Sequence, residues 1–132
     1  MKLFFVIGAF LILLWEFLTK WPDNYFHLII CDVGQGDAIL LKYDQMQILI
    51  DTGPDESLIT CLNQKLPFWD KKIDVLILTH FDDDHIGGFA SLSQTYAIDY
   101  IFLPLTNYKE SETFLELKSR ISALQEAGTI VK

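Results

Sequence analysis

The segment that decides the fold runs from Ile73 to Gly88 and reads IDVLILTHFDDDHIGG. Its first half is a near-continuous run of β-branched and leucine side chains, typical of a central strand that is covered on both faces. Its second half places three carboxylates and two imidazoles within six residues, from His80 to His85, followed by two glycines. Carboxylates at this spacing repel one another, and neither group stabilises an apolar core. The pattern therefore predicts that a positive ion belongs at the carboxyl end of this strand.

The acidic segment itself has the composition of a metal site. His80, Asp82 and Asp84 stand two residues apart, so in an extended loop their side chains point the same way, and His85 follows directly. Clustered imidazoles and carboxylates are common metal ligands, and a buried strand before them holds them rigidly. The alternative is a solvated acidic loop, and we assign Asp83 to solvent. Glycosidase chemistry by two carboxylates is disfavoured by the adjacent histidines.

Short apolar runs separated by turn signals surround this segment. Their order is a strand and a hairpin followed by strands that alternate with helices, which predicts an α/β or α+β sandwich. In the last predicted helix Ser111 stands at the N-cap and Gly128 at the C-cap. The predicted strands are 25–33, 38–43, 47–53, 73–80 and 98–104, with another starting at 129, and the predicted helices are 56–66, a short one after residue 87, and 111–128.

The first eighteen residues, MKLFFVIGAFLILLWEFL, form a separate apolar segment. Between Lys2 and Glu16 nothing is charged, and sixteen helical residues span about 24 Å, which is short of the roughly 30 Å hydrocarbon core of a bilayer. No small residues suited to signal cleavage follow it. We therefore predict a transmembrane signal anchor over 1–20 and a linker over 21–24. A cleaved signal peptide and a helix buried against a partner are the alternatives, and Lys2 balances Lys20, so the orientation is undetermined.

Composition limits the function classes. The chain has 132 residues, 51% of them hydrophobic, and a net charge of −8. This acidity disfavours passive binding to nucleic acid, but it does not exclude an enzyme whose bound cations offset its carboxylates. Cys31 and Cys61 are read as two buried thiols, with a disulfide expected only outside the cytosol. His27 is read as a half-buried sheet residue rather than a ligand.

Three motifs together resemble one family. THFDDDHIGG resembles the signature of the metallo-β-lactamase superfamily, H-x-H-x-D-H followed by glycine. QILIDTG resembles the first motif of that superfamily, with Asp51 at the strand end. DVGQGDAIL, residues 32–40, resembles the opening hairpin of one branch, the extracellular domain of the competence protein ComEC, a DNA-uptake channel. That branch also carries an Asp in place of the second signature histidine, as Asp82 does here. The resemblance extends from about Tyr25 to Lys132.

The resemblance implies a role for each residue of the signature. His80 and Asp82 would bind a first metal ion, and Asp84 and His85 a second. Asp84 would also be the catalytic residue that orients the attacking water. The implied cofactors are two divalent cations per complete site, Mn²⁺ or Zn²⁺, with Mg²⁺ as a further candidate. The carboxylate at Asp82 moves the preference of the first site towards Mn²⁺ or Mg²⁺.

The family pattern also implies residues outside the ligand set and a larger fold. Asp51 would steady the ligand loop, and Asp37 would face the site, although GQGD (34–37) also reads as a plain hairpin turn. The family fold is an αββα sandwich of two halves, and its second half supplies a further His, a bridging Asp and a last His. With three histidines in all, residues 25–132 are expected to form a truncated domain, the N-terminal half alone. A missing C-terminal half or a partner chain would complete it.

These expectations lead to a membrane-anchored, extracytoplasmic, metal-dependent hydrolase. The first candidate is a phosphodiesterase or nuclease related to DNA uptake, with the membrane and DNA as partners. The second is a hydrolase of another extracytoplasmic ester or phosphodiester, and the third is an inactive fragment or binding module. Whether this chain by itself is an enzyme stays open at this point, because two-ligand metal sites bind weakly.

Overall fold

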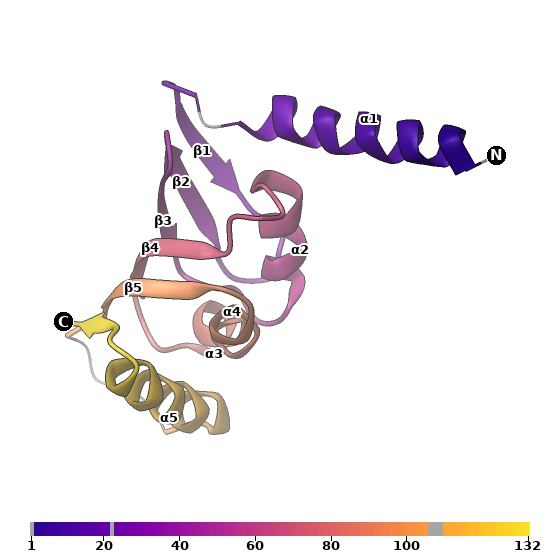
Figure 1. Cartoon of the computed structure of the whole chain (residues 1–132). Coiled ribbons are helices and arrows are strands. Elements are labelled where there is room, and N and C mark those ends of the chain that lie inside the picture. Colours follow the sequence, from indigo (N-terminus) through magenta and orange to yellow (C-terminus); the bar gives the residue numbers. More distant parts are fainter. Residues whose placement is uncertain (1, 22, 106–109) are drawn as a thin grey trace.

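The chain folds around a six-stranded sheet in the order β1-β2-β3-β4-β5-β6 (Figure 1). The structure is a computed structural model that describes residues 2–21, 23–105 and 110–132. The first three strands are antiparallel, and β3 to β6 run parallel. The strands are β1 (Phe26–Ile30), β2 (Ile39–Tyr43), β3 (Met46–Ile50), β4 (Lys72–Ile77), β5 (Ala97–Phe102) and β6 (Ile130–Val131).

The helices fall into two groups. α1 (Lys2–Lys20) projects away from the rest of the molecule, whereas the other four lie against the sheet (Figure 1). α1 is long and apolar enough to cross a membrane, a test that a signal sequence also passes. The four helices against the sheet are α2 (Ser57–Lys65), α3 (Asp83–Ile86), α4 (Phe89–Thr95) and α5 (Glu112–Glu126).

One row of apolar side chains in the core crosses the whole sheet. Side chains alternate between the faces of a strand, so residues directly opposite one another in adjacent strands share a face. The four central members of the row are 0% exposed and pack against buried leucines of α2 and α4. Burial of each contributes about 2 kcal/mol. The row consists of Ile29, Leu40, Leu49, Leu76, Ile101 and Val131.

The opposite face of the sheet is equally apolar but open. Leu28 is 62% exposed, Tyr100 39% and Ile130 44%. The sequence prediction that β4 is covered on both faces is therefore wrong for the described part of the chain, where helices cover one face only. We call this surface the open sheet face. The row of directly opposite residues that crosses it consists of Leu28, Leu41, Ile48, Val75, Tyr100 and Ile130.

Most predicted elements are confirmed, and the acidic segment is the main exception. Ser111 caps α5 by accepting a hydrogen bond from the backbone N of Phe114 at 3.1 Å. The C-cap is Ala127 rather than the predicted Gly128, which follows it with a φ of 112°. The acidic segment, however, is not extended throughout. Asp82 is extended and begins α3, because its carbonyl accepts the N–H of His85 at 2.9 Å. Asp84 and His85 therefore project from a helical turn.

The two cysteines form a disulfide, which corrects their interpretation as free buried thiols. Cys31 follows β1 and Cys61 lies on α2, with their Cα atoms 5.7 Å apart. The bridge closes a loop of 30 residues, and closing a loop of this size stabilises a domain by about 3–4 kcal/mol.

Candidate metal centre

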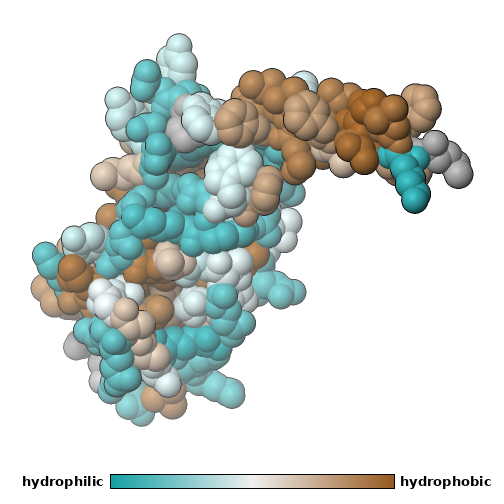
Figure 2. Space-filling view, in the orientation of Figure 1, coloured by the Kyte–Doolittle hydropathy of each residue, from teal (hydrophilic) through white to brown (hydrophobic). Residues whose placement is uncertain are grey.

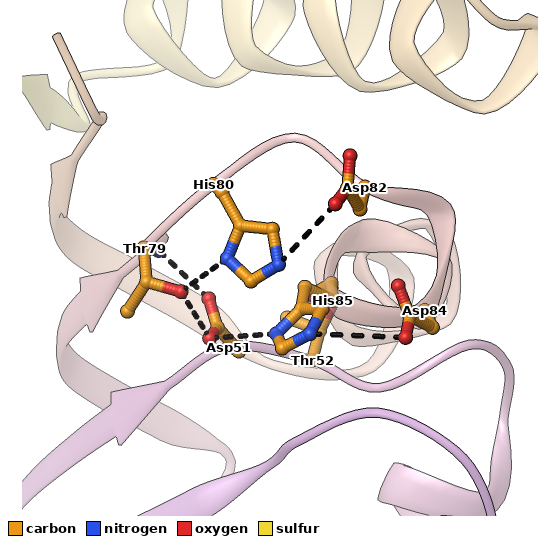
Figure 3. A network of polar contacts seen from close by, with 7 residues as sticks. All are labelled: Asp51, Thr52, Thr79, His80, Asp82, Asp84 and His85. Carbon is orange, nitrogen blue, oxygen red and sulfur yellow. Dashed lines mark hydrogen bonds and ion pairs between the residues drawn. The ribbon is translucent and has the colours of Figure 1, made fainter. Parts of the chain in front are cut away.

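The predicted ligands meet at one edge of the sheet, where β3 and β4 end (Figure 3). Asp51 directly follows β3, His80 lies three residues after β4, and Asp84 and His85 come from α3. Adjacent parallel strands end at the same edge, which is why residues 29 positions apart in sequence become neighbours. The N–H of Asp51 donates to the carbonyl of Ile77 at 2.9 Å and ties the two strand ends together.

Asp51 is the buried centre of the site. It is 2% exposed and adopts a φ of 57°, which is uncommon for a residue other than glycine. Its Oδ1 accepts the backbone N–H of Thr79 at 2.8 Å. Its Oδ2 lies 2.5 Å from the Thr79 hydroxyl and 3.0 Å from His85 Nδ1. A buried carboxylate is stable only when its oxygens are hydrogen-bonded, and three donors meet that need here.

Both the side chain and the backbone of His85 are held by hydrogen bonds. Asp51 accepts the proton of its Nδ1, and its backbone carbonyl accepts the N–H of Thr52 at 2.8 Å and the Thr52 hydroxyl at 2.9 Å. His85 is 8% exposed. With Nδ1 occupied, the free nitrogen is Nε2, which lies 3.8 Å from Asp84 Oδ2.

His80 is oriented by the same carboxylate through one intermediate. Because the Thr79 hydroxyl donates to Asp51, its oxygen is left to accept the Nδ1 proton of His80 at 2.8 Å. The free Nε2 of His80 then lies 3.6 Å from Asp82 Oδ2, and the His80 and His85 rings are 3.7 Å apart between centroids. One buried carboxylate thus sets the tautomer of both imidazoles.

The donor set fits divalent cations. Two groups have ligand atoms within 4.8 Å of one another: Asp51 with His80 and His85, and His80 with Asp82 and Asp84. Asp51 already accepts three hydrogen bonds, so we assign it to orienting the imidazoles rather than to coordination. The atoms left free are the Nε2 of both histidines and the carboxylates of Asp82 and Asp84, which are the four ligands expected from sequence.

In the described part of the chain, no lysine or arginine pairs with this cluster. Within residues 2–21, 23–105 and 110–132, every ion pair of Asp51, Asp82 and Asp84 is with an imidazole. Asp82 and Asp84 have side chains 78% and 49% exposed, so they reach solvent above the buried Asp51–His85 pair.

The glycines of the motif permit close packing. A Cβ at Gly87 would overlap the carbonyl oxygen of Pro54, and one at Gly88 that of Thr52. Both φ values are helical, so the requirement for glycine comes from the close approach of the neighbouring chain rather than from a positive φ. Gly36 adopts a φ of 86° and packs in the same way against the Asp84 carbonyl.

Other candidates lie outside the ligand groups. Asp37 is exposed, and it contacts the site region through its carbonyl, which accepts the N–H of Gly53 at 2.9 Å. Asp83 is exposed, as predicted, but accepts the hydroxyl of Ser111 at 2.8 Å and so joins α3 to α5. His27 is half-buried in β1, as expected, and pairs with Asp23 at 2.8 Å.

Two threonines escaped the sequence analysis. Thr79 connects Asp51 to His80, and Thr52 holds the backbone of His85. Each threonine stands directly beside a predicted site residue, Thr52 after Asp51 and Thr79 before His80. Adjacency was the available signal, but it indicates nothing about which oxygen the hydroxyl will reach.

Comparison with known proteins finds a matching family model and two curated relatives. Residues 31–109 match the family model of the metallo-beta-lactamase superfamily. The chain is 31% identical over 74 residues to the competence protein ComA of Neisseria gonorrhoeae, a match that covers 55% of this chain and 11% of that protein. It is 29% identical over 79 residues to hydroxyacylglutathione hydrolase of Stenotrophomonas maltophilia (strain R551-3), covering 60% of this chain and 25% of that protein.

A solved structure of the metallo-beta-lactamase SMB-1, bound to 2-mercaptoethanesulfonate, aligns with 63% of this chain and 34% of that chain. The TM-score is 0.49 and the sequence identity 18%. Of the two curated relatives, the chain spans only 11% of the competence protein and 25% of the hydroxyacylglutathione hydrolase.

Proposed function

The chain belongs to the metallo-beta-lactamase superfamily, and from this premise we propose that it is the ligand-bearing part of a metal-dependent phosphodiesterase or nuclease that serves DNA uptake. The observation that carries the proposal is the set of four free ligand atoms on one sheet edge, with both imidazoles oriented by Asp51. The similarity to a competence protein supports the link with DNA.

We assign the ligands in two pairs. His80 and Asp82 would hold one cation, and His85 and Asp84 the other. When bound, divalent cations polarise a phosphoryl oxygen and provide a nucleophile at neutral pH. Asp82 supplies a hard oxygen, which favours Mn²⁺ or Mg²⁺ over Zn²⁺ at the first position. Asp84 turns Oδ2 towards His85, so its other oxygen is available to accept a proton from an attacking water.

The chain's own residues supply orientation. Asp51 and Thr79 keep the Nδ1 protons of His80 and His85 in place, so that each Nε2 presents a lone pair towards a neighbouring carboxylate. Thr52 prevents α3 from moving away from β3. Fixing the donors before the cation arrives reduces the entropy cost of binding it.

We propose that α1 anchors the protein in a membrane and that the domain lies outside the cytosol. α1 is apolar along its length, and the Cys31–Cys61 disulfide is a feature of oxidising compartments. In vesicles made from the expressing cells, maleimide-polyethylene glycol should label Cys31 and Cys61 only after reduction. Labelling without reductant would contradict this location.

We also propose that a second β-sheet covers the open sheet face and brings further ligands to the site. An apolar surface continuous over all six strands is larger than a soluble domain usually leaves exposed, and sheets commonly pack face to face. Substituting L28K together with Y100K should abolish hydrolysis while leaving the far-ultraviolet circular dichroism unchanged. Unchanged hydrolysis would contradict a covering sheet.

A second candidate function is hydrolysis of a thioester or ester. The similarity to hydroxyacylglutathione hydrolase favours it, whereas the oxygen donor at Asp82 favours phosphodiesters. The deciding experiment offers the full chain, in lipid nanodiscs with Mn²⁺, two substrates in parallel: single-stranded DNA and S-lactoylglutathione. We expect DNA cleavage; turnover of the thioester alone would support the second candidate.

The matched variants for this assay are H80A, D84N and D83N. H80A and D84N each remove one assigned ligand and should abolish the hydrolysis that the unsubstituted chain shows. D83N removes a neighbouring carboxylate that contacts Ser111 instead of the ligand groups, and should retain activity. Equal activity in all three would refute the site, and no hydrolysis by the unsubstituted chain would favour the binding-module alternative.

A further inference from the structure

Four aromatic rings join the end of α1 to the loop between α2 and β4. Phe17 and Trp21 have ring centroids 4.3 Å apart, Phe17 contacts Trp69 at 6.0 Å, and Trp69 meets Phe68 edge-on at 4.9 Å. We call these four residues the aromatic collar. All of them are between 43% and 56% exposed, so the collar presents a continuous apolar surface to solvent although its rings contact one another.

The collar continues the apolar surface of α1. In Figure 2 this helix is a brown rod that projects from a body on which teal and white predominate. A helix of 19 residues is about 28 Å long, close to the roughly 30 Å hydrocarbon core of a bilayer. If α1 crosses a bilayer, its last turn, which contains Phe17, lies where hydrocarbon meets headgroups. Tryptophan is enriched at that depth in membrane proteins.

We propose that the collar is a second membrane contact, in which Phe68 and Trp69 enter the lipid–water interface beside α1 and seat the domain on the bilayer. The contact between Trp69 and Phe17 places the loop at the depth of the last helical turn. This inference rests on the proposed membrane anchorage and is independent of the proposed hydrolase activity.

The polar groups around the collar suit a headgroup environment. Lys20 pairs with Glu16 at 2.8 Å and donates to the carbonyl of Asn63 at 3.3 Å. Lys71 donates to the side-chain oxygen of Asn63 at 2.7 Å. Both lysines carry long apolar stems that can lie along the rings while their ammonium groups stay hydrated. These contacts also tie α1, α2 and the loop into one unit, so the collar should not need to rearrange on a membrane.

The seating would direct the candidate metal centre towards the aqueous side. Trp21 and Trp69 line a groove together with Met46 and Lys72, the first residues of β3 and β4. The predicted ligands follow the opposite ends of these strands. Six residues of strand separate the two regions by about 20 Å, so the substrate would arrive from solution rather than from the lipid phase.

Depth-dependent fluorescence quenching tests the proposal on the full chain in phosphatidylcholine–phosphatidylglycerol vesicles that contain lipids brominated near the headgroup. The chain has three tryptophans, so W15F/W21F leaves Trp69 as the only one and W21F/W69F leaves Trp15. A variant with all three replaced by phenylalanine and carrying L115W reports from α5, where Leu115 is 55% exposed and outside the collar.

We expect the bromolipids to quench Trp69 and Trp15 by about a third or more, and the tryptophan at position 115 not at all. Quenching of Trp15 without quenching of Trp69 would overturn the seating while leaving the anchor intact. Quenching of neither would overturn both the anchor and the seating, and would leave the proposed hydrolase to its own assay.

Discussion

The two ends of β3 and β4 both gather carboxylates, but they differ in what neutralises them. At the amino ends, the Lys72 ammonium lies 2.7 Å from a carboxylate oxygen of Asp74 and 2.7 Å from one of Asp99. The buried Gln47 donates its backbone N–H to Asp74 at 2.7 Å and its side-chain amide to Asp70 at 2.5 Å. At the carboxyl ends, Asp82 and Asp84 face imidazoles alone among the described residues.

This difference distinguishes a structural charge network from a candidate metal centre. The amino-end network contains its own cation in Lys72, whose pKa is raised by hydrogen bonds to Asp74 and Asp99. Among the described residues, no lysine or arginine pairs with the carboxyl-end cluster, and its histidines turn free nitrogens towards the carboxylates. A cluster of carboxylates therefore indicates a metal site only where no lysine or arginine of the protein already neutralises it. Substitutions at each of the two ends test this contrast.

The largest effect is expected for D51A. It removes the acceptor that orients both imidazoles and leaves the Thr79 and His85 donors unpaired in a buried position. We expect Mn²⁺ affinity to fall by about 100-fold and the free energy of unfolding by about 2–4 kcal/mol. Isothermal titration and urea denaturation measure the two quantities. Unchanged Mn²⁺ affinity would refute the orienting role.

H80A should separate metal binding from stability. The side chain is 37% exposed and contacts Thr79 and Asp82 near the surface, so its loss should cost less than about 1 kcal/mol of stability. Mn²⁺ affinity should still fall by at least about 10-fold, because a ligand is lost. If H80A lost as much stability as D51A, the division between buried orienting residues and exposed ligands would fail.

K72M tests the amino-end network. Removal of the ammonium leaves Asp74 and Asp99 repelling each other and should lower the thermal midpoint slightly, because exposed ion pairs contribute little. Mn²⁺ affinity should remain that of the unsubstituted chain. A parallel loss of Mn²⁺ binding would show that the two ends of the strands are not independent.

The smallest expected effect is a pH dependence at Asp70. Burial raises the pKa of this carboxyl above its ordinary value, and the repulsion of Asp74 adds to the increase. The folded state therefore takes up a proton at a higher pH than the unfolded state does, so protonation of Asp70 favours folding as the pH falls through the folded pKa. Relative to D70N, the unsubstituted chain should gain stability as the solution is acidified from neutral pH. Parallel stability curves would contradict this.

The sequence predicted the α5 helix correctly but not the helical turn within the ligand segment. The N-cap at Ser111 is a local feature of the sequence, and the structure confirms it. The helical turn α3 was missed, because its first hydrogen bonds depend on where Asp82 is held by the strand before it. The interpretation of the two cysteines as thiols was wrong for a similar reason, since nothing in the local sequence brings Cys31 near Cys61.

By itself the sequence determined most of the strands, the apolar N-terminal segment and the four candidate ligands, because each depends on residue type and on spacing within a few positions. Only the tertiary structure decided that Asp51 serves both histidines and that Thr79 carries its effect to His80. It also decided that one face of the sheet stays open and that Trp69 meets Phe17. These are contacts between distant segments, and the register of the sheet and the packing of the helices determine them.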